Sequence, residues 1–308
     1  MTEAAHPVRR IWKAAMHRIR LAAECAARLA RLGCAVLRVP VRKPFLVLRC
    51  ASGEAVSGLF SEFAAVLGAL EHYERWRPIY AGIHVDFGIE GLYYDPARGS
   101  NWWDYYFETI DVGRREGAGV TVVSDRLHDI FAYRIPHLAR DRGYALISLY
   151  IRLRPALQQA VDDYVRDRFG ADFVIGVHYR GTDKWQDAPR VSYEEVEASV
   201  RAVARSAPDG KYRVFVATDE AAFIDFMRSR FHERLLYLEM FRSVDGRPMD
   251  VVNDDGNYRK GRDAVLDCVL LSRCHHLVRT ASNLSLCSLH FNPGLPEVAL
   301  NRERQGWP

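Results

Sequence analysis

The segment FVIGVHYRGTDK, from Phe173 to Lys184, decides the fold prediction for this chain. Its first five residues are a short apolar, β-branched run, the pattern of a buried parallel strand that leads into a functional loop. Ligands of open α/β sheets bind beside the carboxyl ends of the strands. The loop supplies an imidazole, a guanidinium, a carboxylate and an ammonium, a set that suits an anionic ligand. These groups belong to His178, Arg180, Asp183 and Lys184. On pattern alone, a solvated charge cluster at a strand end is the alternative.

Strand and helix patterns alternate through the second half of the chain. Helices are predicted over 155–169, 193–206, 221–231, 263–274 and 282–290, and strands over 173–177, 213–217, 235–238 and 276–279. Such alternation predicts a doubly wound parallel sheet with right-handed crossovers. Residues 151–308 are therefore expected to form a Rossmann-like domain.

A separate domain is predicted to begin after Pro40 and Pro44, with a strand at 45–49. The next segment, 51–63, is a glycine-containing turn that leads into a helix. Backbone N–H groups and the helix N-terminus favour anions there, and Gly58 is a candidate contact. The glycines fit no complete phosphate-loop pattern, so this indication is weak.

Residues 101–107 (NWWDYYF) carry five aromatic side chains. Flat rings stack on pyranose faces, and Asp104 is able to accept hydrogen bonds from sugar hydroxyls. The segment is predicted to be either a sugar platform or a plug in the core or domain interface.

Charge is distributed unevenly along the 308 residues. Residues 1–43 contain ten Lys or Arg and two Glu, a net charge of +8, so the other 265 residues carry −4 of the total of +4. The apolar positions of 8–38 recur at helical spacing, which predicts either a basic helix on an anionic membrane surface or a helix packed on the globular body. Nucleic-acid binding is not expected, because the rest of the chain is acidic on balance and has no nucleic-acid motif.

Composition indicates a soluble protein in a reducing compartment, with 49% hydrophobic and 27% charged residues. The six cysteines show no paired metal-ligand spacing, and no apolar stretch is long enough to span a membrane or to serve as a signal peptide core. A cytoplasmic protein is expected, with peripheral contact at the inner membrane face as the further prediction from residues 8–38.

Polar residues at three strand ends are expected to face one crevice: those after 173–177, Asp219 after 213–217, and Thr280 with Ser282 after 276–279. Asp267 lies in an apolar helix, where an unpaired carboxylate is costly. It is expected either to pair with an arginine in the structure or to accept hydrogen bonds from a ligand ring or Arg180. His178 fits a catalytic base or a packing residue, and no acidic spacing suggests a metal site.

Three segments together resemble the GDP-fucose-dependent fucosyltransferases: HYRGTDK at 178–184, VATDEA at 216–221 and DAVLDCVLLSRCHHLVRTASNLS at 263–285. The resemblance is to the core α1,6-fucosyltransferases, the nodulation-factor fucosyltransferases and the protein O-fucosyltransferases. It is strong over 174–290, fainter over 45–110 and absent from 1–43.

The resemblance implies a GT-B-like fold of two Rossmann-like domains with a deep cleft between them: an acceptor domain at 44–150 and a nucleotide-sugar domain at 151–308. It implies an inverting, metal-independent transfer of fucose from GDP-fucose to a hydroxyl of a glycan or glycolipid acceptor, without a cofactor. Another nucleotide sugar, or non-catalytic nucleotide-sugar binding, is the alternative.

Matched by position, the resemblance implies that Arg180 binds the diphosphate and neutralises the charge on the departing GDP. It implies that Lys184 assists at the phosphates. It assigns Asp267 to the guanine, and His178, Asp219, Thr280, Ser282 and Asn283 to the nucleotide or sugar. Two departures stand out. The α1,6 group has a second arginine where Gly181 stands, and a glutamate one residue beyond Asp187. Asp187 is therefore the candidate base, with Asp183 next.

Overall fold

The computed structural model describes Ala30 and residues 42–49, 58–89, 91–114, 121–124, 138–182, 188–245 and 256–301. Apart from Ala30, the predicted helix over 8–38 lies outside these residues, so its membrane role stays a prediction. In the part of the chain just given, no helix combines the length and apolar character needed to cross a membrane.

The first half forms a mostly parallel sheet in the order β3-β2-β1-β4. Its strands are β1 (Phe45–Leu48), β2 (Gly82–Val85), β3 (Asp111–Gly113) and β4 (Thr121–Ser124). Only the edge strand β3 runs antiparallel, against β2. All four residues of β1 are buried, as its unbroken apolar sequence predicts. Helix α2 (Leu59–Arg75) follows β1 and buries most of its residues.

The aromatic segment is a core plug. Trp102, Trp103, Tyr106 and Phe107 are each at most 1% exposed, and the rings of Trp103 and Phe107 stack with centroids 4.4 Å apart. Phe63 of α2 packs against both of these rings. Of the two predictions for 101–107, the core prediction is confirmed, and the sugar platform is wrong because the rings are inaccessible.

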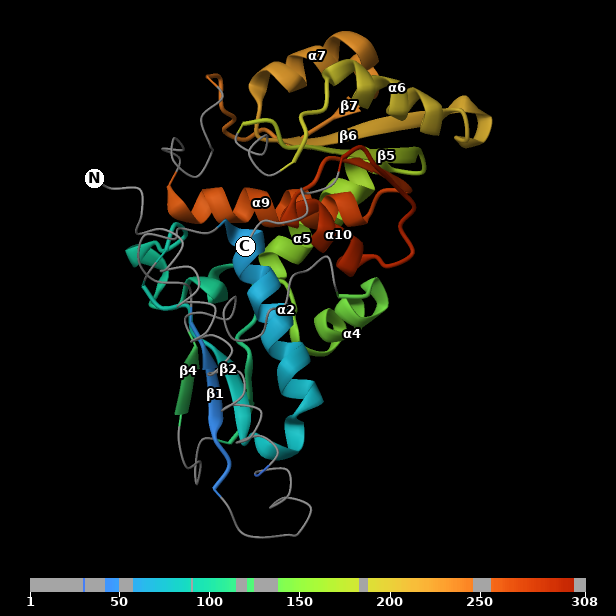
Figure 1. Cartoon of the computed structure of the whole chain (residues 1–308). Helices are drawn as coiled ribbons and strands as arrows, with labels where there is room; N and C mark the ends of the chain where they lie inside the picture. Colours follow the sequence, from blue (N-terminus) through green and yellow to red (C-terminus); the bar gives the residue numbers. More distant parts are fainter. Residues whose placement is uncertain are drawn as a thin grey trace, which may run out of the picture.

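The second half is an entirely parallel sheet in the order β7-β6-β5-β8-β9. Its strands are β5 (Phe173–Tyr179), β6 (Tyr212–Thr218), β7 (Leu235–Leu236), β8 (His276–Arg279) and β9 (Glu297–Ala299). Figure 1 shows α6 and α7 on one face and α5, α9 and α10 on the other. These helices are α5 (Pro155–Tyr164), α6 (Tyr193–Ala204), α7 (Ala221–Phe231), α9 (Asn257–Ser272) and α10 (Asn283–Phe291). The predicted α/β class is confirmed, and β9 is a strand of this sheet that the sequence did not predict.

Gly176 explains how α9 lies so close to the central strand β5. A Cβ atom at Gly176 would lie 2.9 Å from Cys274 Sγ and 3.1 Å from Leu271 Cδ2. A larger residue would push the helix layer off the sheet, so the glycine in the apolar run has a packing cause.

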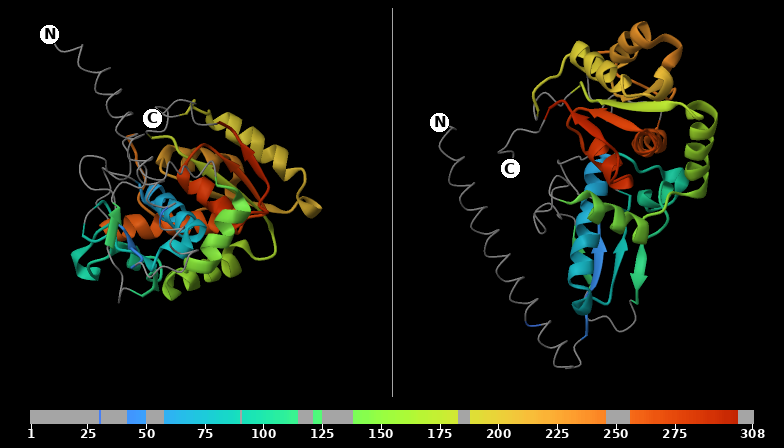
Figure 2. Two further views of the ribbon diagram at one scale, coloured as in Figure 1. Left: turned by 60° about the horizontal axis from the view of Figure 1, so that its bottom comes forward. Right: turned by 90° about the vertical axis from the view of Figure 1, so that its right-hand side faces the viewer.

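The two halves share a helical interface. Helix α10 packs against α9, α2 and α4 (Arg140–Tyr150), and Phe63 of α2 lies 5.7 Å from Phe291 of α10 between ring centroids. Figure 2 shows from two further directions that this helical layer lies between the sheets. The predicted domain boundaries at 43 and 150, and the deep cleft, stay predictions.

Candidate active site

The point where the strand order reverses lies between β5 and β8, because the chain leaves β5 toward β6 on one side and returns to β8 on the other. Arg180 and Thr280 directly follow these strands. The Arg180 N–H donates to Thr280 Oγ1 at 3.0 Å, and the Thr280 N–H donates to the His178 carbonyl at 3.0 Å. Ligands of doubly wound sheets bind outside such a reversal, so these two strand ends mark the candidate site.

Asp219 holds the Arg180 loop from the end of β6. Its Oδ2 lies 3.0 Å from Arg180 Nε and accepts the Thr182 hydroxyl at 2.6 Å, while its Oδ1 accepts the Gly181 N–H at 3.1 Å. The Asp219 side chain is 8% exposed, whereas that of Arg180 is 31% exposed. A buried carboxylate thus orients a guanidinium that still reaches the surface, which is preorganisation for an anion.

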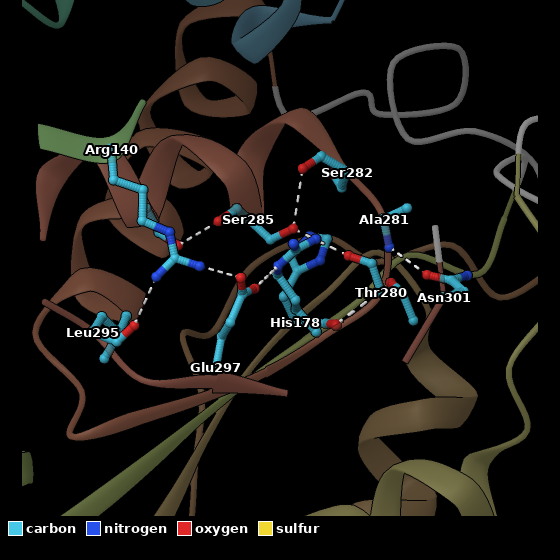
Figure 3. A network of polar contacts seen from close by, with 11 residues as sticks. Arg140, His178, Thr280, Ala281, Ser282, Ser285, Leu295, Glu297 and Asn301 are labelled. Atoms are coloured by element: carbon cyan, nitrogen blue, oxygen red, sulfur yellow. Dashed lines mark hydrogen bonds and ion pairs between the residues drawn. The ribbon is translucent and has the colours of Figure 1, made fainter. Parts of the chain in front are cut away.

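The N-terminus of α10 adds a second anion-favouring feature beside Thr280. Ser282 is the N-cap, and its Oγ accepts the Leu284 N–H at 3.3 Å. Ser285 Oγ donates to the carbonyls of Thr280 and Ser282 at 3.1 and 3.0 Å. Figure 3 shows this hydroxyl cluster around the end of β8. The unpaired N–H groups of a helix start carry partial positive charge, so the cluster suits a phosphate.

Asn283 joins the two halves at this site. Its Nδ2 donates to Ser61 Oγ in the first turn of α2 at 2.9 Å. Gly58 is the N-cap of that helix, so the structure brings it to the same region as Asn283. Gly58 has φ −67° and open space around its Cβ position, so neither backbone nor packing requires glycine. A contact of Gly58 with the donor stays a prediction.

An ion-pair network supports the far side of β8. Arg140 of α4 and Arg279 of β8 both contact the Glu297 carboxylate of β9, and Arg140 Nη1 donates to the Leu295 carbonyl at 3.2 Å. Figure 3 shows Arg140 reaching across to Glu297. Asn301 then accepts the Ala281 N–H at 2.6 Å, which fixes the loop after β8. Sequence reasoning missed this network because its members are far apart in the chain.

His178 and Asp267, the other predicted nucleotide contacts, are buried at 4% and 3% exposure. Burial raises the pKa of Asp267 to about 8, with the Arg242 charge acting in the opposite direction. The Oδ1 atom of Asp267 has no hydrogen-bond partner within the residues that the structure describes. Among the residues that the structure describes, no arginine forms an ion pair with Asp267, and contact of His178 or Asp267 with a nucleotide stays a prediction.

Glu220 accounts for the glycine at position 181. A Cβ atom on Gly181 would lie 2.3 Å from Glu220 Oε1, and Glu220 Oε2 accepts the Tyr193 hydroxyl at 2.7 Å. A second arginine at 181 has no room while Glu220 is held there. The adjacency of Glu220 to Asp219 was the signal that could have identified it.

Arg190 is a second guanidinium beside Arg180. Both line a small pocket at the end of β5, together with Thr280 and Asn301. The pocket has a volume of about 10 Å³, the space of about one water molecule. Asp183, Lys184 and Asp187 lie outside the described residues, so their predicted roles are untested. Within the described ranges, no cluster of three or more His, Cys, Asp or Glu is arranged to hold a metal ion.

Comparison with known proteins gives structural but no sequence matches. No family model and no curated protein matches the chain. A crystal structure of NodZ α-1,6-fucosyltransferase soaked with GDP-fucose superposes with a TM-score of 0.54 at 17% identity, covering 82% of this chain and 94% of that one. The fucosyltransferase NodZ from Bradyrhizobium gives a TM-score of 0.54 at 16% identity, covering 86% and 99%. The chain therefore has the GT-B-like fold of the NodZ fucosyltransferases, the fold that its sequence motifs predict.

Proposed function

We propose that this protein is an inverting glycosyltransferase that transfers fucose from GDP-fucose to a hydroxyl of a glycan acceptor. The observation that carries the proposal is Arg180, a surface-reaching guanidinium held at the sheet's reversal point in a fold shared with NodZ. NodZ structures have been obtained with GDP-fucose and with GDP.

Arg180 would act on the leaving group. In the transfer, the acceptor oxygen forms a bond to the sugar's anomeric carbon as the bond to the β-phosphate oxygen breaks. The electron pair leaves on the phosphate, where negative charge grows. A fixed guanidinium is most effective where charge develops, because it does not need to reorganise during the reaction. The hydroxyl proton would pass to a carboxylate, for which Asp187 and then Asp183 are the candidates.

Arg190 would supply the second phosphate contact. A diphosphate offers two phosphoryl groups, and Arg190 lines the same pocket as Arg180 while position 181 is closed to a side chain by Glu220. The α10 N-terminus beside Thr280 would complete an anion site built without a metal ion. We further propose a cytoplasmic location, with residues 8–38 contacting an anionic membrane surface.

The test is GDP binding and sugar transfer by an Arg180→Ala variant. Arg213→Ala is a matched control, because Arg213 pairs with Asp172 at 2.6 Å before the start of β5, at the opposite end of the same sheet. We expect Arg180→Ala to lose calorimetric GDP binding and transfer, and Arg213→Ala to keep both. Transfer that survives in a folded Arg180→Ala protein would refute the assignment.

The donor is tested by mass spectrometry with GDP-fucose and GDP-mannose against a panel of glycan acceptors. Turnover of GDP-fucose supports the proposal. Turnover of GDP-mannose alone points to another donor sugar on the same fold, and tight GDP binding without any turnover points to a non-catalytic nucleotide-sugar sensor.

A further inference from the structure

A second, larger pocket lies at the other end of α10 from Ser282. Its volume is about 800 Å³, within the range of small-molecule sites. Phe291 and Asn292 line it at the C-terminal end of α10, and Arg273 lines it at the end of α9. The nine residues of α10 separate it from the candidate donor site by roughly 13 Å at 1.5 Å per residue. None of the donor-site residues lines this pocket.

The pocket has an apolar lining with an aromatic ring at its edge. Ile147, Ile151, Val269 and Phe291 contribute apolar surface. Tyr144 of α4 also lines it and is 47% exposed, one of few large apolar side chains that are exposed among the residues the structure describes. An accessible aromatic face beside apolar surface is suited to stacking against a sugar ring.

Two guanidinium groups give the pocket a positive charge. Arg152 and Arg273 are exposed, and neither forms an ion pair with any residue that the structure describes. Glu108 is the one carboxylate among the described lining residues, so these three charged groups sum to +1. The dipole of α9 favours a cation at Arg273 but does not explain Arg152, which lies in the link between α4 and α5. Planar guanidinium groups of this kind recognise carboxylates.

The remaining lining groups suit a ligand with hydroxyls. Asn292 Nδ2 donates to the Ser272 carbonyl at 2.9 Å, which fixes the amide and leaves its oxygen as an acceptor. Gln158 and Ser148 add further polar atoms. A purely apolar ligand would bury these groups without partners, at a cost of about 1–3 kcal/mol each.

We propose that this pocket binds an acidic saccharide, with its carboxylate on Arg152 and Arg273 and a sugar ring on Tyr144, at a site separate from the donor crevice. The proposal goes beyond the function proposed above, because binding at this pocket requires no sugar transfer. Glu108 belongs to the first half of the chain and Arg273 to the second. A ligand bound in this pocket would therefore also stabilise the contact between the two halves.

The experiment is calorimetry on the full chain in saturating GDP, with digalacturonate, an uncharged disaccharide and inorganic phosphate as probes. We expect digalacturonate to bind, and Arg273→Gln and Tyr144→Ser each to weaken that binding at least tenfold. Arg205→Gln, at an exposed position after α6, is the control and should leave it unchanged. All variants change exposed side chains, and their melting temperatures verify folding.

Four outcomes overturn the proposal. No binding of digalacturonate refutes the site, and equal binding of the uncharged disaccharide refutes the role of the two arginines. Equally strong binding of inorganic phosphate refutes a saccharide ligand. Binding of digalacturonate that appears only when the titration is repeated without GDP would place the ligand in the donor crevice. A failure of the proposed transferase function leaves this experiment unaffected, because it measures binding alone.

Discussion

The substitution Asp219→Asn isolates the positioning of Arg180 from the presence of its charge. The carboxylate makes three contacts: to Arg180 Nε at 3.0 Å, to the Thr182 hydroxyl at 2.6 Å and to the Gly181 N–H at 3.1 Å. Asparagine keeps one oxygen for the Gly181 N–H and loses the charge that holds the guanidinium. Arg180 itself stays in place in the sequence, so any loss of GDP affinity reports on its orientation.

The size of the expected change in GDP affinity follows from the conformational freedom that the Arg180 side chain regains in the Asp219→Asn variant. Immobilising an arginine side chain costs about 1.5–2 kcal/mol. In the wild type, the ion pair with Asp219 already immobilises the Arg180 side chain when the protein folds. In the Asp219→Asn variant, Arg180 becomes immobilised only when GDP binds, and the entropic cost then weakens binding. We therefore expect the Kd for GDP to rise about 10- to 30-fold, since each 1.4 kcal/mol is about tenfold.

The assay is titration calorimetry with GDP, with melting temperatures measured in parallel. Asp172→Asn is the matched control, because Asp172 binds Arg213 at 2.6 Å at the opposite end of the sheet and should leave the GDP Kd unchanged. An Asp219→Asn protein that is folded and binds GDP as tightly as the wild type would refute the positioning argument.

Three further predictions concern stability, each read from denaturant or thermal unfolding. Gly181→Ala places a Cβ atom 2.3 Å from the Glu220 carboxylate and should lower the free energy of unfolding by about 1–3 kcal/mol; unchanged stability would show that Glu220 moves aside freely. Trp103→Ala removes a ring that is 1% exposed and should cost about 3–5 kcal/mol, whereas a loss below about 1 kcal/mol would contradict the core role of the aromatic plug. The Asp267 pKa of about 8 in the folded protein, against 3.8 as its ordinary value, means that folding holds this proton more tightly. The contribution of protonated Asp267 to the free energy of unfolding is therefore complete below about pH 4. It falls by up to about 1.4 kcal/mol per pH unit as the pH rises toward 8. Asp267→Asn should remove this dependence and gain stability relative to wild type from pH 5 to 8, and parallel pH profiles for the two proteins would refute it.

Local patterns predicted the elements of the second half with mixed accuracy: α9 begins at Asn257, six residues before its predicted start at 263, and β7 ends at Leu236 rather than at 238. Helix α7 (Ala221–Phe231) and strand β8 (His276–Arg279) have the predicted bounds, and the helix predicted over 282–290 is α10 (Asn283–Phe291), with Ser282 as its N-cap. Such features depend on residues close together in the chain, whose periodicity and capping chemistry are visible without tertiary contacts. Strand β9 was missed because three residues carry little periodicity.

The sequence also located the strand-end residues of the site, because the carboxyl ends of parallel strands meet at one edge. The resemblance assigned Asp219 to the nucleotide or sugar, and that contact stays a prediction. The 3.0 Å approach of its carboxylate to Arg180 was not predicted, because it joins side chains that follow two different strands. The aromatic segment at 101–107 was ambiguous, since stacking on a sugar and packing in a core use the same rings.

By itself, the amino-acid sequence determined the alternation of strands and helices and the residues that end each strand, because both depend on near neighbours in the chain. Only the tertiary structure decided the pairing of Arg180 with Asp219, the occupation of the space beside Gly181 by Glu220, and the pocket between α4, α9 and α10. Each of these joins segments that are distant in sequence. Their contacts depend on how the sheets and helices pack, and no local pattern specifies that packing.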